Sequence, residues 1–214
     1  MQQEKGLREV DGKIGYGTRK ILGITHRLFD EQENYGVDYF PGEPFVGGAG
    51  DQYEIDPNDV RQGALGNCYF AAAMMAVAKA NPSLIRKLIK SNGDGTYTIT
   101  LYTEKGTEDF LVTPYFPAYR YSADVNLPAY AGYGDIQPNL AEIWPMLLEK
   151  AYAMHLETYG ESEKGAGGYD LVGKGGNVGK AIKTLTGPTT PEYSEKHTYQ
   201  MPDIHLVKDW TWLN

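Results

Sequence analysis

Cysteine is almost absent from this sequence: Cys68 is the single cysteine among 214 residues. An intrachain disulfide is therefore excluded, and cysteine usage says little about the compartment in which the protein works. Basic residues are outnumbered, with 20 Lys and Arg against 28 Asp and Glu, which gives a formal net charge of −8. Because no basic stripe is present to neutralise phosphates, we expect neither a nucleic acid nor an anionic membrane surface as a partner.

Long apolar runs are also lacking. No run approaches the roughly 18 residues that a membrane span requires. The first residues, MQQEKGLREVDGKIGYG, do not place an apolar stretch after a basic one, so they do not resemble a secretory signal. We therefore expect a soluble, cytoplasmic protein, and the sequence leaves export by a specialised route open.

Glycine and tyrosine are abundant, with 26 and 17 residues, which is typical of loop-rich structure. Helical periodicity is found in four segments besides the one that begins near Cys68. A β-hairpin is predicted where polar and apolar residues alternate about the turn EKGT, and Gly/Pro/aromatic-rich stretches indicate loops. The predicted helices cover 18–32, 83–90, 139–160 (with Asn139 as its N-cap) and 177–187, the hairpin covers 96–112, and the loops cover 35–52, 114–138 and 163–179. Helices without βαβ alternation, together with a hairpin, predict an α+β fold.

The cysteine stands in the stretch RQGALGNCYFAAAMMAVA, where a glycine-containing loop runs into a helix. A lone cysteine before an apolar run is most often an inert core thiol. Here, however, the predicted helix begins at Asn67 and Cys68, and a helix N-terminus favours the thiolate form. Gln62 lies six residues upstream, where its side-chain amide can reach an oxyanion beside the sulfur. Both interpretations remain open at this point.

Several segments resemble the calpain-type cysteine proteases. The family's active-site segment reads Q-G-x-L-G-[DN]-C-[WYF], and this sequence has QGALGNCY at 62–69. The family's helix E-F-W-x-x-L-L-E-K-A-Y-A-K is similar to EIWPMLLEKAYAM at 142–154, and GGYDLVGKGG and AIKTLTG follow in the family's order. The resemblance covers about residues 50–187.

The resemblance implies a papain-like, Cys-bearing catalytic subdomain over 50–187, preceded by an N-terminal extension (1–49) and followed by a tail or the start of a second subdomain (188–214). It also implies that Cys68 is the nucleophile, that Gln62 and the Cys68 backbone N–H stabilise the oxyanion, and that the Gly176 backbone contacts the bound peptide. No cofactor is expected for the chemistry.

A calcium site is a further implication of the resemblance. The family binds Ca²⁺ through an Asp nine residues before the cysteine and a Glu two residues before the Trp, positions that Asp59 and Glu142 occupy here. Hard oxygen ligands suit Ca²⁺. The alternative is that Asp59 caps the glycine loop and that Glu142 is a solvated acid in the first turn of its helix.

The general base is the feature that the sequence does not supply clearly. A cysteine nucleophile needs an imidazole partner. His197, in KHTYQM, faintly resembles the family's G-H-A-Y-S-V strand, but only nine residues separate it from Gly187, and no N-P-W-G motif follows it. We therefore expect the catalytic His and Asn to lie outside this chain, on a second protease subdomain, and we expect His26 and His155 to be structural or exposed.

The sequence thus predicts a cysteine endopeptidase of the calpain-like family that acts on a protein or peptide substrate, with only its Cys-bearing part present. Ca²⁺ is predicted as a regulator. The competing hypothesis is a catalytically inactive calpain-like module that binds or regulates another protein.

Overall fold

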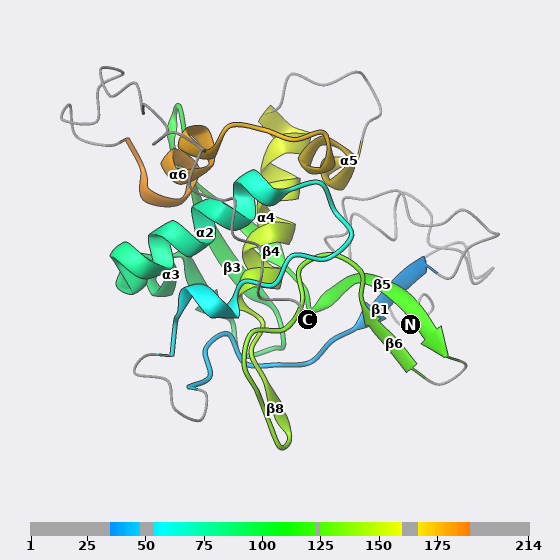
Figure 1. Ribbon diagram of the computed structural model, residues 1–214. Helices are drawn as coiled ribbons and strands as arrows, with labels where there is room; N and C mark the ends of the chain where they lie inside the picture. The colour runs from blue at the N-terminus through cyan, green and yellow to red at the C-terminus, as the bar shows by residue number, and fades with distance from the viewer. Residues whose placement is uncertain (1–34, 48–53, 123–124, 160–166, 189–214) are drawn as a thin grey trace, which may run out of the picture.

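The computed structural model describes residues 35–47, 54–122, 125–159 and 167–188. The helix that carries the cysteine, α2 (Cys68–Ala80), packs against α6 (Val178–Thr186) and is followed directly by α3 (Pro82–Leu88). The long helix α4 (Trp144–Tyr159) runs through the middle of the molecule and contacts α5 (Gly168–Gly173) (Figure 1). A short 3-10 helix, η1 (Pro57–Asp59), precedes the cysteine loop. The predicted α+β fold class is confirmed.

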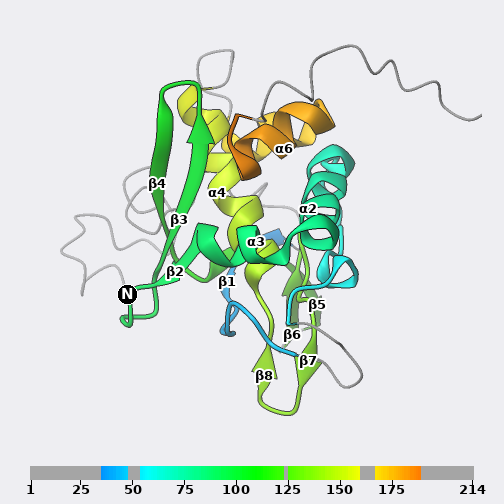
Figure 2. The same cartoon turned by 90° about the vertical axis from the view of Figure 1, so that its left-hand side faces the viewer.

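The strands form three small antiparallel sheets. One sheet has the order β2-β3-β4 and contacts α4 and α6 through β3, a second has the order β1-β5-β6, and β7 pairs with β8 in a hairpin that projects from the body (Figure 2). The strands are β1 (Tyr35–Tyr39), β2 (Ile89–Ser91), β3 (Tyr97–Thr103), β4 (Gly106–Val112), β5 (Tyr115–Ser122), β6 (Val125–Pro128), β7 (Ile136–Gln137) and β8 (Leu140–Ala141).

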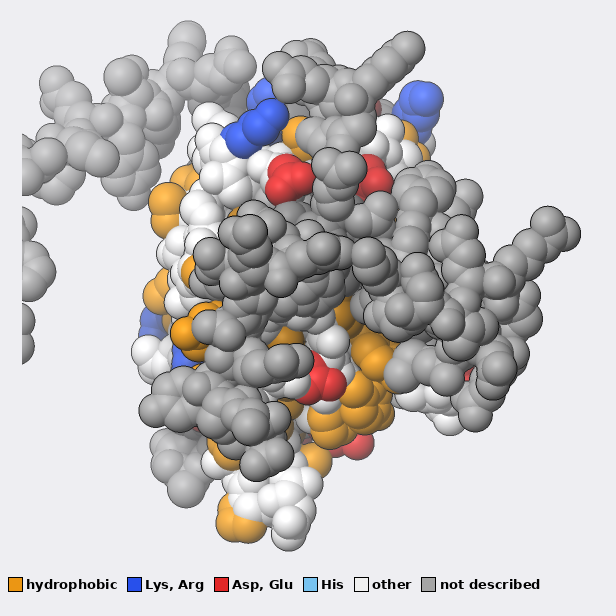
Figure 3. Space-filling view, turned by 90° about the vertical axis from the view of Figure 1, so that its right-hand side faces the viewer, with side chains coloured by type: hydrophobic (Ala, Val, Ile, Leu, Met, Phe, Trp, Pro, Cys, Tyr) orange, Lys and Arg blue, Asp and Glu red, His pale blue; other side chains and the backbone are white. Residues whose placement is uncertain are grey.

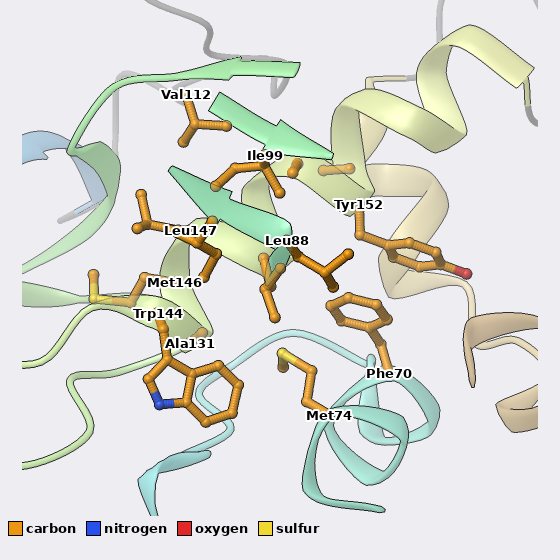
Figure 4. Packing of buried hydrophobic residues seen from close by; sticks show 14 of the residues in the cluster. Phe70, Met74, Leu88, Ile99, Val112, Ala131, Trp144, Met146, Leu147 and Tyr152 are labelled. Atoms are coloured by element: carbon orange, nitrogen blue, oxygen red, sulfur yellow. The ribbon is translucent and has the colours of Figure 1, made fainter. Parts of the chain in front are cut away.

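The hydrophobic core gathers around α4, in which every residue from Trp144 to Ala153 is buried. Phe70 and Met74 of α2 face this helix, and the Phe70 ring stacks on Tyr152 with ring centroids 4.0 Å apart (Figure 4). Lys150 is fully buried too, and its ammonium donates to the Thr113 and Tyr115 carbonyls. A helix that is buried around its whole circumference is a central helix rather than an amphipathic surface helix.

Three segments predicted as loops contain regular structure. Residues 35–52 include β1, residues 114–138 include β5, β6 and β7, and residues 163–179 include α5. The loop prediction failed at β1 and β5 because β1 contains Tyr and Gly and β5 contains Tyr and Pro, residues that are common in loops. The two strands are held by pairing across 84 positions, with Tyr35 opposite Tyr119. Long-range pairing of this kind overrides local composition.

The helix predictions are mostly confirmed, with two errors at boundaries. The helix predicted over 83–90 ends at Leu88, because Ile89–Ser91 form β2 and pair with β3. Helix α4 begins at Trp144 and not at Asn139, which instead has a φ of 71° in the β7–β8 turn, directly after Pro138. Asn tolerates this left-handed conformation and is therefore a turn residue here. Pro145 lies in the first turn, where a missing N–H costs nothing. The hairpin over 96–112 is confirmed as β3–β4, α6 ends at Gly187 as predicted, and the predicted helix 18–32 lies outside the described residues.

On one face, hydrophobic side chains gather beside an acidic group (Figure 3). The exposed apolar residues of the β1-β5-β6 sheet include Tyr39 and Leu127. Of the helices that the structure describes, none combines the length and apolarity that crossing a membrane would require.

Candidate active site

Cys68 is the first residue of α2, and its side chain is exposed. The predicted position at a helix N-terminus is therefore observed, and the thiol is not buried in the core. The apolar positions that follow, including Tyr69, Phe70 and Ala73, are buried and fix the helix against the core. The alanines among them allow close packing, so the exposed Cys68 side chain is attached to a helix that is packed tightly against the core.

The loop before Cys68 fits tightly against two neighbouring segments. Ala64 N–H donates to the Ala129 carbonyl, and a Cβ at Gly63 would lie 2.1 Å from the Tyr130 carbonyl oxygen. A Cβ at Gly66 would lie 2.6 Å from the Gly173 carbonyl oxygen at the end of α5. Both glycines are required because the approaching atoms are backbone atoms, which cannot rotate away.

Gln62 lies in the same loop, and its side-chain amide donates to the Leu65 carbonyl at 2.7 Å. The hydrogen bond holds the amide within the loop, although the residue as a whole is exposed. A carboxamide nitrogen carries two hydrogens, so one remains for another acceptor. The role of Gln62 at an oxyanion stays a prediction.

Gly176, in the segment between α5 and α6, lies against the residue next to the cysteine. A Cβ at this position would lie 2.5 Å from two ring carbons of Tyr69. The structure thus brings Gly176 to the beginning of α2. Its contact with a substrate backbone stays a prediction.

An acidic cluster is built from Asp59 of η1, Asp135 before β7 and Glu142 between β8 and α4. One carboxylate oxygen of each lies within 4.8 Å of those of the other two. The predicted pair, Asp59 and Glu142, is therefore brought together. Asp135 was not predicted, because only the β7–β8 hairpin, closed by Glu142 N–H donating to the Asp135 carbonyl, brings it to the pair. The sequence also predicts backbone carbonyls around 52–54 as further ligands, and of these residues only Glu54 is described.

The environment of Glu142 rules out its interpretation as a solvated acid, because its side chain is fully buried. It accepts hydrogen bonds from the backbone N–H groups of Val46 (3.0 Å) and Asp135 (3.3 Å). Burial is the main cause that raises the pKa of Glu142 to about 8, and the charge of Asp59 also raises it. The two hydrogen bonds act in the opposite direction. Asp59 has a capping role as well, since it accepts from the Asp56 N–H and from the indole Nε1 of Trp144.

The donor set of the acidic cluster fits a hard cation. Three carboxylates in one place repel one another, and a divalent cation would offset that repulsion while taking only oxygen ligands. Asp59, Asp135 and Glu142 would hold the ion.

His155 is the only histidine among the residues that the structure describes. Its ring packs against Phe110, Tyr152 and Tyr159, with centroids 6.2, 6.0 and 5.3 Å away. Burial lowers its pKa, and the charge of Glu108 partly counters this. His26 and His197 lie outside the described residues, so the prediction that neither of them serves Cys68 is not tested by the structure.

Comparisons with known proteins identify the family to which the chain belongs. Residues 51–207 match the family model of the calpain family cysteine proteases, which covers well over half of the chain. The division at residue 187 between two subdomains stays a prediction. The chain is also 26% identical, over 163 residues, to the calpain-type cysteine protease DEK1 of Arabidopsis thaliana. That alignment covers 75% of this chain and only 7% of the plant protein. With an exposed cysteine at the start of α2, in the segment that this family model covers, the chain belongs to the calpain family of cysteine proteases.

Proposed function

We propose that this chain is a cysteine endopeptidase domain in which Cys68 attacks the carbonyl carbon of a peptide bond in a protein substrate. The observation that carries the proposal is the exposed thiol at the first position of a 13-residue helix, in a calpain-family chain. The thiolate adds to the carbonyl, the amine leaves with a proton, and water then hydrolyses the thioester.

The oxyanion of the tetrahedral intermediate would accept hydrogen bonds from two groups. The Cys68 backbone N–H lies in the first turn of α2, where amide protons have no partner within the helix. The Gln62 amide would donate its second hydrogen while the first stays on the Leu65 carbonyl. A donor held in place before the reaction needs no reorganisation when charge develops.

The base that serves Cys68 is proposed to lie outside the residues described. His155 is surrounded by aromatic rings of β4 and α4, which gives it a packing role. We propose that a second protease subdomain supplies the imidazole and the asparagine that orients it.

Acylation of Cys68 by an activated peptidyl ester tests the nucleophile and the oxyanion donor together. Such an ester carries a good leaving group and does not need the missing imidazole to protonate it. Because the chain has one cysteine, and neutral hydroxylamine cleaves a thioester but not the amide formed at a lysine, the acyl mass lost on hydroxylamine treatment reports acylation of Cys68 alone. We expect the wild type to acylate faster than a cysteine peptide and Cys68→Ser not to acylate. Gln62→Ala should be slower by about 100-fold, the usual loss when one oxyanion donor is removed.

Two controls make this result specific. Gln137→Ala, on the exposed hairpin, should acylate at the wild-type rate. Alkylation by iodoacetamide, which forms no oxyanion, should be unaffected by Gln62→Ala. A wild-type rate no higher than that of the cysteine peptide would instead favour the inactive binding module.

We also propose that the acidic cluster of Asp59, Asp135 and Glu142 binds a regulatory Ca²⁺ ion. The proximity of three carboxylates, two of them buried, supports this. The ion would supply no chemistry to the reaction. Bound at Asp59, it would fix η1, which leads into the loop before Cys68.

The calcium proposal predicts a thermal shift. At a Ca²⁺ concentration 100 times the dissociation constant, the folded state should gain about 2.7 kcal/mol, seen as a rise in melting temperature. Glu142→Gln and Asp59→Asn should abolish this rise, whereas Glu104→Gln, on the exposed β3–β4 turn, should retain it. An equal rise in all four proteins would place the calcium elsewhere, and no rise in the wild type would remove the site.

A further inference from the structure

Asn67, the residue directly before Cys68, is hydrogen-bonded to a buried glutamate of α4. Asn67 is 1% exposed and occupies the N-cap position of α2, but its side chain does not cap that helix. Its Nδ2 donates to Glu149 Oε2 at 2.5 Å instead. Among the described residues, its Oδ1 has no hydrogen-bond partner. Among the described residues, the side chain of Asn67 is therefore held by its hydrogen bond to Glu149.

Asn67 in turn sets the first turn of α2. Its carbonyl accepts the N–H groups of Phe70 (2.8 Å) and Ala71 (3.0 Å). These bonds fix the peptide group between Asn67 and Cys68. They therefore also fix the position of the Cys68 backbone N–H and the direction of the Cys68 side chain. A displacement of Asn67 would be transmitted directly to the thiol.

Glu149 connects three parts of the fold at this point. It comes from α4, is 2% exposed, and accepts the Ala131 N–H on Oε1 at 3.1 Å while Oε2 accepts from Asn67. The segment 129–132 also binds the cysteine loop directly, because Ala129 accepts the Ala64 N–H and Gly132 donates to the Arg61 carbonyl. One buried carboxylate thus joins the central helix, this segment and the start of α2.

We propose that Glu149 is a positioning residue for Cys68, acting through its hydrogen bond to Asn67, and that its charge opposes formation of the thiolate. The proposal rests on the proposed role of Cys68 as nucleophile. The hydrogen bonds with Ala131 and Asn67 require a polar side chain here but not a charged one, and a neutral amide would be buried at a lower cost. The position of this carboxylate, hydrogen-bonded to the residue that precedes the nucleophile, is what points to a role in the reaction.

The ionisation of Glu149 falls in the neutral range. Burial raises its pKa to about 7, although the bonds from Ala131 and Asn67 act in the opposite direction. Among the neighbouring titratable groups, Tyr169 of α5 interacts electrostatically with Glu149 and with Tyr130 of the segment 129–132. Burial, and after it the charge of Glu149, raises the pKa of Tyr169 well above its ordinary value, so this tyrosine stays neutral. The ammonium of Lys150, the next residue, donates to the carbonyls of Thr113 and Tyr115.

Replacement of Glu149 by glutamine removes the charge and keeps the shape. One side-chain oxygen can still accept from Ala131 N–H. The new amide can donate to the Asn67 Oδ1, which has no partner in the present arrangement, if the Asn67 amide turns over. The variant therefore keeps one hydrogen bond to Ala131 and one to Asn67. Glu157→Gln is the matched control, because it makes the same change on the exposed end of the same helix.

The test measures the rate of alkylation by iodoacetamide against pH, from pH 5 to 10, on the full chain. In the wild type we expect two steps, one of them near pH 7, since a negative charge that forms on Glu149, bonded to the residue next to Cys68, disfavours the thiolate. In Glu149→Gln the step near pH 7 should disappear, and the rate between pH 7 and 8 should rise severalfold. Glu157→Gln should reproduce the wild-type profile. Circular dichroism verifies that each variant is folded.

The outcomes separate this proposal from the proposed function. Superimposable profiles for the wild type and Glu149→Gln would overturn the role of Glu149, whatever the reactivity of Cys68. If the wild type alkylates and acylates only as fast as a cysteine peptide, the proposed function fails, yet a step that Glu149→Gln removes would still establish the link to Asn67 and Cys68. If Glu149→Gln does not fold, the wild-type profile decides: a single step contradicts the proposal, and a second step near pH 7 that persists in His155→Gln supports it.

Discussion

Replacement of Trp144 by alanine is expected to lower the free energy of unfolding by about 3–5 kcal/mol, the usual cost of removing a large buried aromatic side chain. Trp144 is fully buried at the first position of α4. Its indole Nε1 donates to the Asp59 carboxylate at 3.2 Å, and its backbone N–H donates to the Pro44 carbonyl. The variant therefore loses packing and also removes a donor from a buried acid.

Urea denaturation of the wild type and two further variants separates the contribution of the packing of the indole from that of its hydrogen bond to Asp59. Trp144→Phe keeps most of the ring but not the donor, so its loss should be smaller than that of Trp144→Ala. Leu111→Ala, at a position that is 56% exposed, should change stability by no more than about 0.5 kcal/mol. A loss below about 1 kcal/mol for Trp144→Ala would contradict the position of this indole in the core.

Where local chemistry determines the structure, the sequence predicts it well. The start of α2 follows from a glycine-containing loop before a run of small apolar residues. The end of α6 follows from Gly187, whose φ of 85° favours glycine. The pairing of β3 with β4 follows from alternation about a short turn. These signals lie within a few residues of the feature that they specify.

Features that depend on distant contacts were not predictable in the same way. Strand β5 pairs with β1 and β6, and neither partner can be identified from the Tyr- and Pro-rich sequence alone. Asp135 joins the acidic cluster only because a hairpin turns the chain back. The sequence also contains no local sign that Glu149 is buried, since a glutamate beside a lysine in a helix is normally solvated. Its burial becomes apparent only with its partners, Asn67 and Ala131.

The buried Glu149 should also make the stability of the folded chain depend on pH. Its pKa rises from 4.5 to about 7 on folding, with burial as the main cause. Between these values the folded state keeps a proton that the unfolded state has lost. The contribution is therefore fully present below pH 4.5, is lost as the pH rises to 7, and amounts to about 3 kcal/mol at 1.4 kcal/mol per pKa unit.

Unfolding in urea at a series of pH values from 4.5 to 8 measures this dependence. Glu142, whose pKa is also raised, contributes in the same direction, so the wild-type slope alone does not isolate Glu149. The difference between the wild type and Glu149→Gln does isolate it, because the amide has no proton to lose. We expect the variant to gain about 3 kcal/mol relative to the wild type between pH 4.5 and pH 7, and Glu157→Gln to follow the wild type throughout. Parallel curves for the wild type and Glu149→Gln would show that Glu149 has the same proton affinity in the folded and unfolded states, which a carboxyl buried behind the cysteine cannot have.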